Sequence, residues 1–464
     1  MRKLIVAIAV AQIILIAGLV VLPVAAEVVP GRYRVYITEQ YPRLGKITEG
    51  VINRVAPVAT ALPAPAQDAG QAVEVDITSL IAAVPTAEPT EKAAPETQPS
   101  PTPGRLSQDA SSPAVSPTAA LVPSPTPVPT MTPTPEPLPT RVVLEGLGVV
   151  RQTFNNCGPA NLTQVLNFLG HDITQAQVAS YLKPNYEDRN VSPWQIADYV
   201  NEQTPLRAEA YSGGTLEMIK TLVAAGFPVV VEKGYQLPES GWWGHYLTIF
   251  GYDDGLKEFY SQDSFLGPWD ASGRVDSYDT MEFYWEQFNY TFYVVYQPEQ
   301  EAAVQAILGP VMLDPLKMWN NAANRADQER QENPENMFAW FNLGTSLTRL
   351  GELTGEQEYY HAGAQAFDQA RKLNLPPRML WYQHRIYTAY QKVGRFDDVI
   401  ALANATLETQ GGRNVEETYW YKGHALLALG DVAGAKRAYQ AALAVNMNFY
   451  PAQWSLDYVA SLSG

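Results

Sequence analysis

The chain has few side chains suited to metal binding or disulfide formation, since its 464 residues include one cysteine, Cys157, and five histidines. A single cysteine excludes an intramolecular disulfide, and the histidines show no metal-ligand spacing. The sequence contains neither a zinc-site pattern nor a cofactor motif, so we expect no metal and no cofactor. A lone cysteine is usually a small buried apolar residue, but it can also be an intermolecular link or a reactive thiol.

Positive charge is also scarce in this chain. Lysine and arginine number 32 against 48 aspartates and glutamates, which gives a net charge of -16. The imbalance is concentrated in residues 142–298, which contain 8 basic and 19 acidic side chains. Such a surface repels phosphate groups, so nucleic acid and an anionic membrane surface are excluded as partners. A basic or neutral substrate would suit this charge, although solubility alone also accounts for it.

One long apolar run stands at the N-terminus. Two basic residues precede an apolar stretch from Leu4 to Leu22. This stretch exceeds the core of about 7 to 15 residues in a cleaved signal peptide and approaches the roughly 20 residues that span a bilayer. We therefore expect residues 1–26 to be a signal anchor in the cell membrane, a single transmembrane helix with the rest of the chain extracytoplasmic. In the alternative, cleavage after the small residues Ala25 and Ala26 releases a secreted protein.

A low-complexity segment separates this run from the globular part of the chain. Residues 56–141 are dominated by proline, threonine, alanine and serine. This composition cannot bury enough apolar surface to offset the entropy of ordering, and it favours extended polyproline structure, so we expect a disordered stalk. Residues 27–55 alternate like one short strand and stay unassigned. Residues 142–298 and 299–464 have the composition of two ordinary domains.

Residues 142–298 have the pattern of an α+β domain, with helices first and strands later. Apolar residues recur at helical spacing after Gly158 and Pro159, which places Cys157 at the start of a helix. Because helices and strands do not alternate, the pattern is not that of a parallel sheet. The further helical patterns cover 175–182, 193–203 and 215–225, and the strand patterns begin at Pro228, His245, Leu256 and Phe292.

The second and third predicted strands form a hairpin whose register brings two polar residues together. Asp253, Asp254 and Gly255 suit a three-residue loop with glycine in the left-handed position. In that register His245 directly faces Asp263, and directly opposed residues lie about 4.5 to 5.5 Å apart on one face of a sheet. A loop of two or four residues would place them on opposite faces.

Four residues together suggest thiol chemistry. The positive end of a helix dipole favours the thiolate of Cys157. His245 can accept the thiol proton, and Asp263 can hold the imidazole in the required tautomer. Gln152, five residues before the cysteine, can direct its amide toward an oxyanion that develops beside the backbone N–H of Cys157.

This set resembles the C39-like cysteine peptidases, papain-fold enzymes related to the peptidases that process bacteriocins. The resemblance covers about residues 148–298 and rests on Gln152, Cys157-Gly158-Pro159-Ala160, Gly244-His245-Tyr246, Gly251-Tyr252-Asp253 and Asp263. By this resemblance, the nucleophile is Cys157, the general base is His245, the orienting carboxylate is Asp263 and the oxyanion donor is Gln152. Ser264 departs from the proline that often follows the aspartate in this family.

These observations predict an extracytoplasmic cysteine peptidase that hydrolyses peptide bonds of a peptide or protein substrate through a thioester acyl-enzyme. Two alternatives stay open. One is a catalytically inactive peptide-binding or scaffolding protein at a bacterial cell surface, and the other is a thiol acyl transferase or isopeptidase that resolves the same thioester with an amine. Four tryptophans either line a substrate cleft or pack in the core or at its rim, namely Trp194, Trp242, Trp243 and Trp269.

Residues 299–464 have a helical pattern with internal repetition. One stretch places small and large residues at the spacing of a tetratricopeptide repeat, at Gly423, Leu426, Gly430, Ala435, Tyr439 and Ala442. Two further copies precede it, one with an insertion around 352–361 and one degenerate, marked by Trp340, Leu343, Gly344, Leu347, Phe367, Ala370, Tyr387, Tyr390, Gly394 and Val399. Three copies are the minimum for a stable stack. We expect all-α tetratricopeptide-like repeats that either bind a protein partner or support the peptidase domain.

Overall fold

The computed structural model describes residues 61–66, 75–82 and 137–462, except 238–240 and 410. By its contacts the chain divides into two compact units, and the structure described below belongs to the unit that contains residues 139–464.

The predicted signal anchor, residues 1–26, and the unassigned residues 27–55 both lie outside the described part of the chain. Within the described part, none of the helices is long and apolar enough to cross a bilayer.

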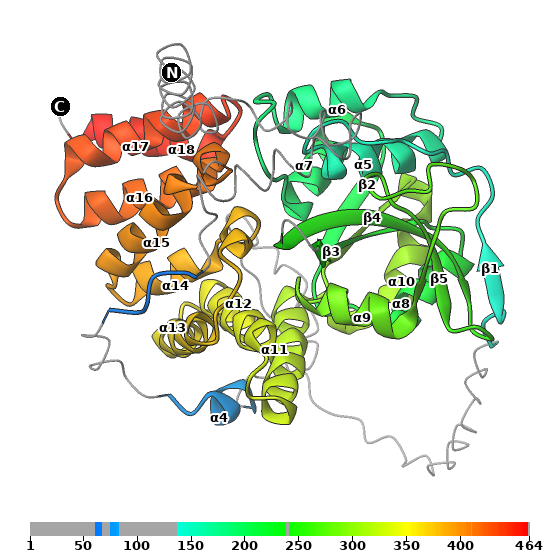
Figure 1. Ribbon diagram of the computed structural model, residues 1–464, viewed down its shortest axis with the longest axis horizontal. Helices are drawn as coiled ribbons and strands as arrows, with labels where there is room; N and C mark the ends of the chain where they lie inside the picture. The colour runs from blue at the N-terminus through cyan, green and yellow to red at the C-terminus, as the bar shows by residue number, and fades with distance from the viewer. Residues whose placement is uncertain (1–60, 67–74, 83–136, 238–240, 410, 463–464) are drawn as a thin grey trace, which may run out of the picture. The chain divides into compact units, whose positions relative to one another are not determined.

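A seven-stranded sheet forms the centre of the first globular part (Figure 1), and every pair of neighbouring strands is antiparallel. Its strand order is β2-β7-β3-β4-β5-β6, with β1 also paired to β4. This arrangement confirms the α+β prediction. The strands are β1 (Arg141–Val143), β2 (Arg207–Tyr211), β3 (Val229–Leu237), β4 (Gly241–Asp253), β5 (Glu258–Gln262), β6 (Arg274–Ser277) and β7 (Phe292–Tyr296).

Three helices cover one face of the sheet, and their bounds agree with the sequence pattern. They are α5 (Cys157–Phe168), α6 (Gln175–Leu182) and α7 (Pro193–Gln203). Thr174 and Ser192 form capping boxes at the starts of α6 and α7, which explains why these two helices begin where they do. The apolar sides of the three helices share a core with Val230 and Tyr246 of the sheet.

The other face of the sheet packs against α8 (Leu216–Ala224), α9 (Tyr278–Glu286) and α10 (Glu301–Met312). Val229 and Val231 lie in this second core, whereas Val230 between them lies in the first. Because both faces are covered here, β3 begins with three consecutive apolar residues, Val229, Val230 and Val231.

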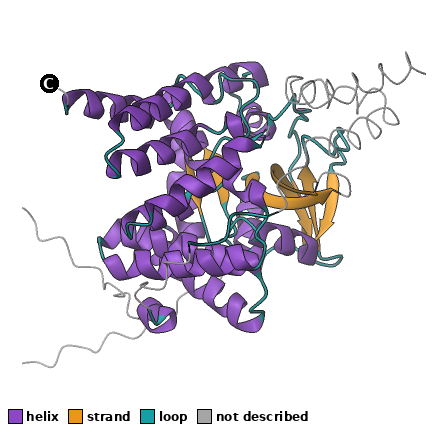
Figure 2. Cartoon of the chain, turned by 60° about the vertical axis from the view of Figure 1, so that its left-hand side comes forward, coloured by secondary structure: helices purple, strands orange, loops and turns teal. Residues whose placement is uncertain are grey.

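The C-terminal part of the chain is helical, as predicted, and Figure 2 shows its helices stacked one after another. A Cβ atom on Gly344 would lie 2.8 Å from the ring of Phe367, and one on Gly423 would lie 2.4 Å from that of Tyr439. Paired helices therefore approach closely at small residues, which is consistent with repeats. The helices are α11 (Pro315–Glu332), α12 (Met337–Thr354), α13 (Gln357–Lys372), α14 (Arg385–Lys392), α15 (Phe396–Glu408), α16 (Glu416–Ala428), α17 (Val432–Val445) and α18 (Tyr450–Ser461), with short 3-10 turns η2 (Pro298–Gln300), η3 (Pro377–Trp381) and η4 (Gly412–Asn414).

Two details of the sequence prediction differ from the structure. The expected insertion around 352–361 is not a separate segment, because α12 continues to Thr354 and α13 starts at Gln357, so the extra residues lengthen one helix pair. Parts of the predicted stalk are ordered, since Leu62 is buried against the helical region and α4 (Ile77–Ala82) buries two isoleucines there. These short pieces pack through their apolar side chains.

Candidate active site

Cys157 is the first residue of α5, as predicted, and it is partly exposed. Asn156 precedes it without a side-chain capping hydrogen bond. Pro159 has no N–H, and the N–H of Ala160 donates to the carbonyl of Asn156. Among the described residues, the N–H groups of Cys157 and Gly158 are therefore the donors left at the positive end of this helix.

The turn before α5 is held by a buried lysine that the sequence pattern did not single out. Asn155 has a φ of 55°, in the left-handed region that asparagine tolerates better than most residues. Nζ of Lys183 donates to the backbone carbonyls of Asn155 at 2.9 Å and of Asp188 at 2.8 Å. Burial lowers the pKa of Lys183 to about 8. The positive charge of Lys183 also helps to lower the pKa of the Cys157 thiol.

His245 and Asp263 are in contact, with Nε2 of the imidazole 2.9 Å from Oδ1 of the carboxylate, and both side chains are buried. The same carboxylate oxygen accepts from the backbone N–H groups of Phe265 at 2.9 Å and Leu266 at 2.8 Å. An ionised carboxylate only accepts hydrogen bonds, so Nε2 is the donor here. Nδ1 is the ring nitrogen that remains for the thiol of Cys157.

The strand register that predicted this contact is wrong, although the contact exists. Asp253 pairs with Glu258, so the loop between β4 and β5 has four residues rather than three. That loop alone would place His245 and Asp263 on opposite faces. A β-bulge between Ile249 and Gly251 adds one residue to β4 and shifts the register back by one. The bulge brings the two side chains back to the same face, and the remaining shift of two residues from the predicted register makes them diagonal neighbours.

The protonation states of Cys157 and His245 depend on each other. Burial by itself raises the pKa of the thiol, but the hydrogen bond and positive charge of His245, with smaller effects of the backbone N–H of Tyr246 and of Lys183, together outweigh burial and bring that pKa below its usual value. For His245, burial lowers the pKa, while the charge and hydrogen bond of Asp263 and the contact with Cys157 raise it to about 9. Burial raises the pKa of Asp263, but the charge and hydrogen bond of His245 and the backbone N–H groups of Leu266 and Phe265 together outweigh burial, so the carboxyl pKa lies well below its ordinary range. These directions favour a thiolate beside an imidazolium at neutral pH.

Gln152 is held by the residue that follows Asp263. The hydroxyl of Ser264 donates to Oε1 of Gln152 at 2.9 Å, and the backbone N–H of Gln152 donates to the carbonyl of Ser264 at 2.9 Å. Because Oε1 is fixed as the acceptor, the amide orientation is defined, and its N–H groups point away from Ser264. The departure from proline at this position therefore adds a hydrogen bond to the candidate site.

Asn161 links these parts, and its position one helical turn after Cys157 in the sequence is the pattern that points to it. Its Nδ2 donates to the carbonyl of Cys157 at 2.9 Å, the carbonyl of Tyr246 at 2.9 Å and the hydroxyl of Ser264 at 3.2 Å. Its Oδ1 accepts from the hydroxyl of Thr248 at 2.7 Å, which fixes the amide orientation. A fully buried asparagine with its partners on α5, β4 and the segment after β5 thus keeps these elements in register.

Two of the four tryptophans pack internally. Trp242 is buried and donates from Nε1 to Gln287 at 2.6 Å, while Trp194 stacks on Trp319, so both pack internally.

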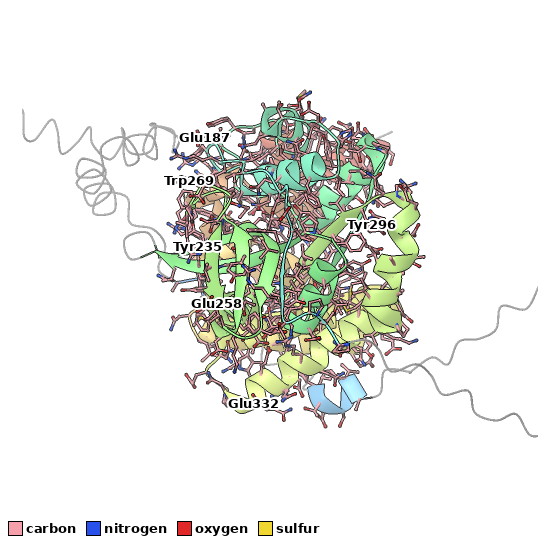
Figure 3. All side chains as sticks on the ribbon, turned by 90° about the vertical axis from the view of Figure 1, so that its right-hand side faces the viewer. Glu187, Tyr235, Glu258, Trp269, Tyr296 and Glu332 are labelled. Carbon is pink, nitrogen blue, oxygen red and sulfur yellow. The ribbon has the colours of Figure 1, made fainter. Side chains whose placement is uncertain are left out.

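Trp243 and Trp269 lie closer to the candidate site. Trp243 packs edge-on against Trp381 of η3. Trp269 is 42% exposed and donates from Nε1 to the carbonyl of Ser264 at 3.2 Å. Figure 3 labels Trp269 and also Tyr235, whose ring contacts that of His245 edge-on at a centroid distance of 5.4 Å.

Comparison with known proteins gives a family match for part of the chain. Residues 145–293 match the model of the Peptidase_C39 like family, so this part of the chain is similar to that family, and the helical region lies outside the match. A solved structure described as a candidate C39-like peptidase from Bacillus anthracis is 17% identical, covers 33% of this chain and 96% of its own, and superposes with a TM-score of 0.28. No curated protein matches the chain.

Proposed function

We propose that this protein is a cysteine peptidase that hydrolyses peptide bonds outside the cytoplasm, with Cys157 as its nucleophile. The family match of residues 145–293 supports peptidase chemistry. The observation that carries the proposal is the series of hydrogen bonds that runs from Asp263 through His245 to the thiol at the start of α5. A structural histidine or a buried apolar cysteine requires no such series of hydrogen bonds.

Acylation uses the thiolate and the imidazolium in turn. The thiolate of Cys157 attacks the carbonyl carbon of the scissile peptide bond, a C–S bond forms, and the carbonyl electron pair moves to oxygen. The backbone N–H of Cys157 and the amide of Gln152 donate to this oxyanion. His245 then gives its proton to the leaving nitrogen, so the amine departs and a thioester remains.

Deacylation reverses the proton flow. Neutral His245 accepts a proton from a water molecule, whose oxygen attacks the thioester carbonyl carbon. The C–S bond breaks, the carboxylic acid product leaves, and the thiolate and imidazolium are restored. Asp263 stays ionised throughout and holds Nε2 of His245, which keeps Nδ1 directed at the reacting atoms.

We also place the protein at the outer side of the cell membrane. The apolar stretch from Leu4 to Leu22, preceded by two basic residues, supports a signal anchor, and a cleaved signal is the alternative. The mass of the N-terminal peptide of the mature protein distinguishes the two, because the anchor retains residues 1–26 and cleavage removes them.

The test of the enzymatic proposal is a peptide-library cleavage profile of the full chain, with Cys157→Ala as the matched control. We expect cleavage products from the wild type and none from the variant. Product masses with an added amine separate hydrolysis from acyl transfer, since transfer adds the amine to the acyl product. Equal cleavage by both chains would show that Cys157 is not the nucleophile, and no cleavage by either would favour a peptide-binding protein.

A further inference from the structure

The helical region holds a short proline-rich stretch of the same chain. Residues 61–66, with the sequence Ala-Leu-Pro-Ala-Pro-Ala, lie against α13, α15 and η3. This stretch falls inside the range that composition assigns to a stalk. Its position on the helices therefore needs a specific physical cause.

The apolar part of this contact is Leu62, which is 8% exposed. The side chain belongs to the same core cluster as Met379, Trp381 and Leu402. It lines a small hollow together with Pro377, Trp381, Ala405, Thr406 and Thr409. An aromatic ring beside a proline-rich segment is the usual feature of surfaces that recognise polyproline structure.

The polar part of the contact is made by a buried arginine and an aspartate. The guanidinium of Arg371 donates twice to the carbonyl of Pro63, from Nε at 3.0 Å and from Nη2 at 2.5 Å. The backbone N–H of Ala66 donates to Oδ1 of Asp398 at 3.2 Å. Arg371 and Asp398 also bind each other at 2.9 Å, and the Arg371 side chain is completely buried.

The hydrogen-bonding groups of the two partners match. Pro63 and Pro65 have no N–H, so an extended segment of this sequence presents mainly carbonyl acceptors, and Arg371 supplies donors to one of them. The N–H of Ala66, which follows the second proline, meets the acceptor of Asp398. Proline-rich segments are already extended before they bind, so little conformational entropy is lost.

We propose that this surface, which we name the proline-rich site and define by Arg371, Trp381, Asp398 and Thr406, is a recognition site for an extended Leu-Pro-Ala-Pro peptide. Residues 61–66 occupy it in cis as a tethered ligand. A peptide of the same sequence added in trans competes with them for the same groups. The proposal is independent of the catalytic role of Cys157.

The test uses the full chain and a fluorescent synthetic peptide of residues 59–68. The variant Leu62→Asp weakens the tethered ligand without changing the proline-rich site, and Ala64→Asp is the matched control, because Ala64 is exposed. Fluorescence anisotropy should show at least about tenfold tighter peptide binding to Leu62→Asp than to the wild type or the control, since a tethered ligand competes at an effective concentration near the millimolar range. A peptide carrying the same leucine-to-aspartate change should bind at least about tenfold more weakly.

A second measurement on the wild type does not depend on any variant folding. The amide of Ala66 should be protected from hydrogen exchange, and a large excess of unlabelled peptide should accelerate its exchange as the tethered segment is displaced. Equal peptide affinity for all three chains, no binding to any of them, or unchanged exchange at Ala66 would overturn the proposal and leave residues 61–66 as a permanent structural contact.

Discussion

The ionisation of Cys157 results from two opposing effects at the residue scale. Burial favours the neutral thiol, whereas the hydrogen bond and charge of His245 favour the thiolate and lower the thiol pKa. His245 in turn keeps its proton up to about pH 9 because of Asp263 and the thiol. The ion pair therefore exists above the lowered thiol pKa and is lost as pH rises through the pKa of His245. Activity should follow a bell-shaped pH profile between these limits.

Replacing Asp263 with asparagine should move the alkaline limit of this profile. Asparagine keeps an acceptor for Nε2 but removes the negative charge that raises the pKa of His245, so burial then dominates and that pKa falls. The alkaline limb of kcat/KM, expected near pH 9 in the wild type, should shift down by about one to two pH units. The pH dependence of cleavage of a fluorogenic peptide measures this shift. If the alkaline limb of kcat/KM stays at the same pH, a group other than His245 determines that limb.

Ser264 should affect the rate of catalysis by holding Gln152 and not by changing the reactivity of the Cys157 thiol. Ser264→Ala removes the donor that holds Oε1 of Gln152, a loss of about 1 kcal/mol, so kcat should fall about fivefold with KM nearly unchanged. Ser264→Thr keeps the hydroxyl and should retain most of the activity. The alkylation rate of Cys157 should be equal in all three chains, because alkylation forms no oxyanion. A parallel fall in alkylation would show that Ser264 affects the thiol directly.

At the element scale, the β4–β5 hairpin shows what the sequence could and could not predict. The helix that begins at Cys157 and the strand that contains His245 follow from local patterns. The bulge at Phe250 does not, because nothing in its apolar surroundings distinguishes it from an ordinary strand residue. The contact between His245 and Asp263 was therefore predicted correctly from an incorrect register. The strands β1, β2 and β6 were missed, since segments of three to five residues carry little periodicity.

The helical pairs pack closely at glycines, and replacing such a glycine with alanine should destabilise the protein, whereas the same change in an exposed helix stabilises it. In an exposed helix, Gly→Ala stabilises by about 1 kcal/mol. A Cβ atom at position 423 would lie 2.4 Å from the ring of Tyr439, so Gly423→Ala should instead destabilise the protein by about 1 to 3 kcal/mol through overpacking. Urea unfolding followed by circular dichroism measures the difference. A stabilised variant would show that α16 and α17 are not packed as closely as described.

At the scale of the whole molecule, the helical region contacts the C39-like domain beside its candidate active site. Arg378 of η3 donates to the carbonyl of Trp242 at 3.2 Å, and a Cβ atom on Gly244 would meet the ring of Tyr382 at 3.0 Å. Near α6, Asn448 donates to the carbonyl of Tyr181 at 2.9 Å. The helices therefore support the strand that carries the candidate base. No local pattern predicts contacts between residues so distant in sequence.

The central claim is that Cys157 is a nucleophile activated by His245, and the pH dependence of its alkylation tests this most directly. Because the chain has one cysteine, iodoacetamide labelling of the intact protein reports on this thiol alone. The wild type should show a midpoint below the value of about 8.5 for a free thiol. His245→Ala should move the midpoint upward from the wild-type value, since the two largest effects that oppose burial are then lost. An ordinary midpoint near 8.5 in both chains would contradict the account.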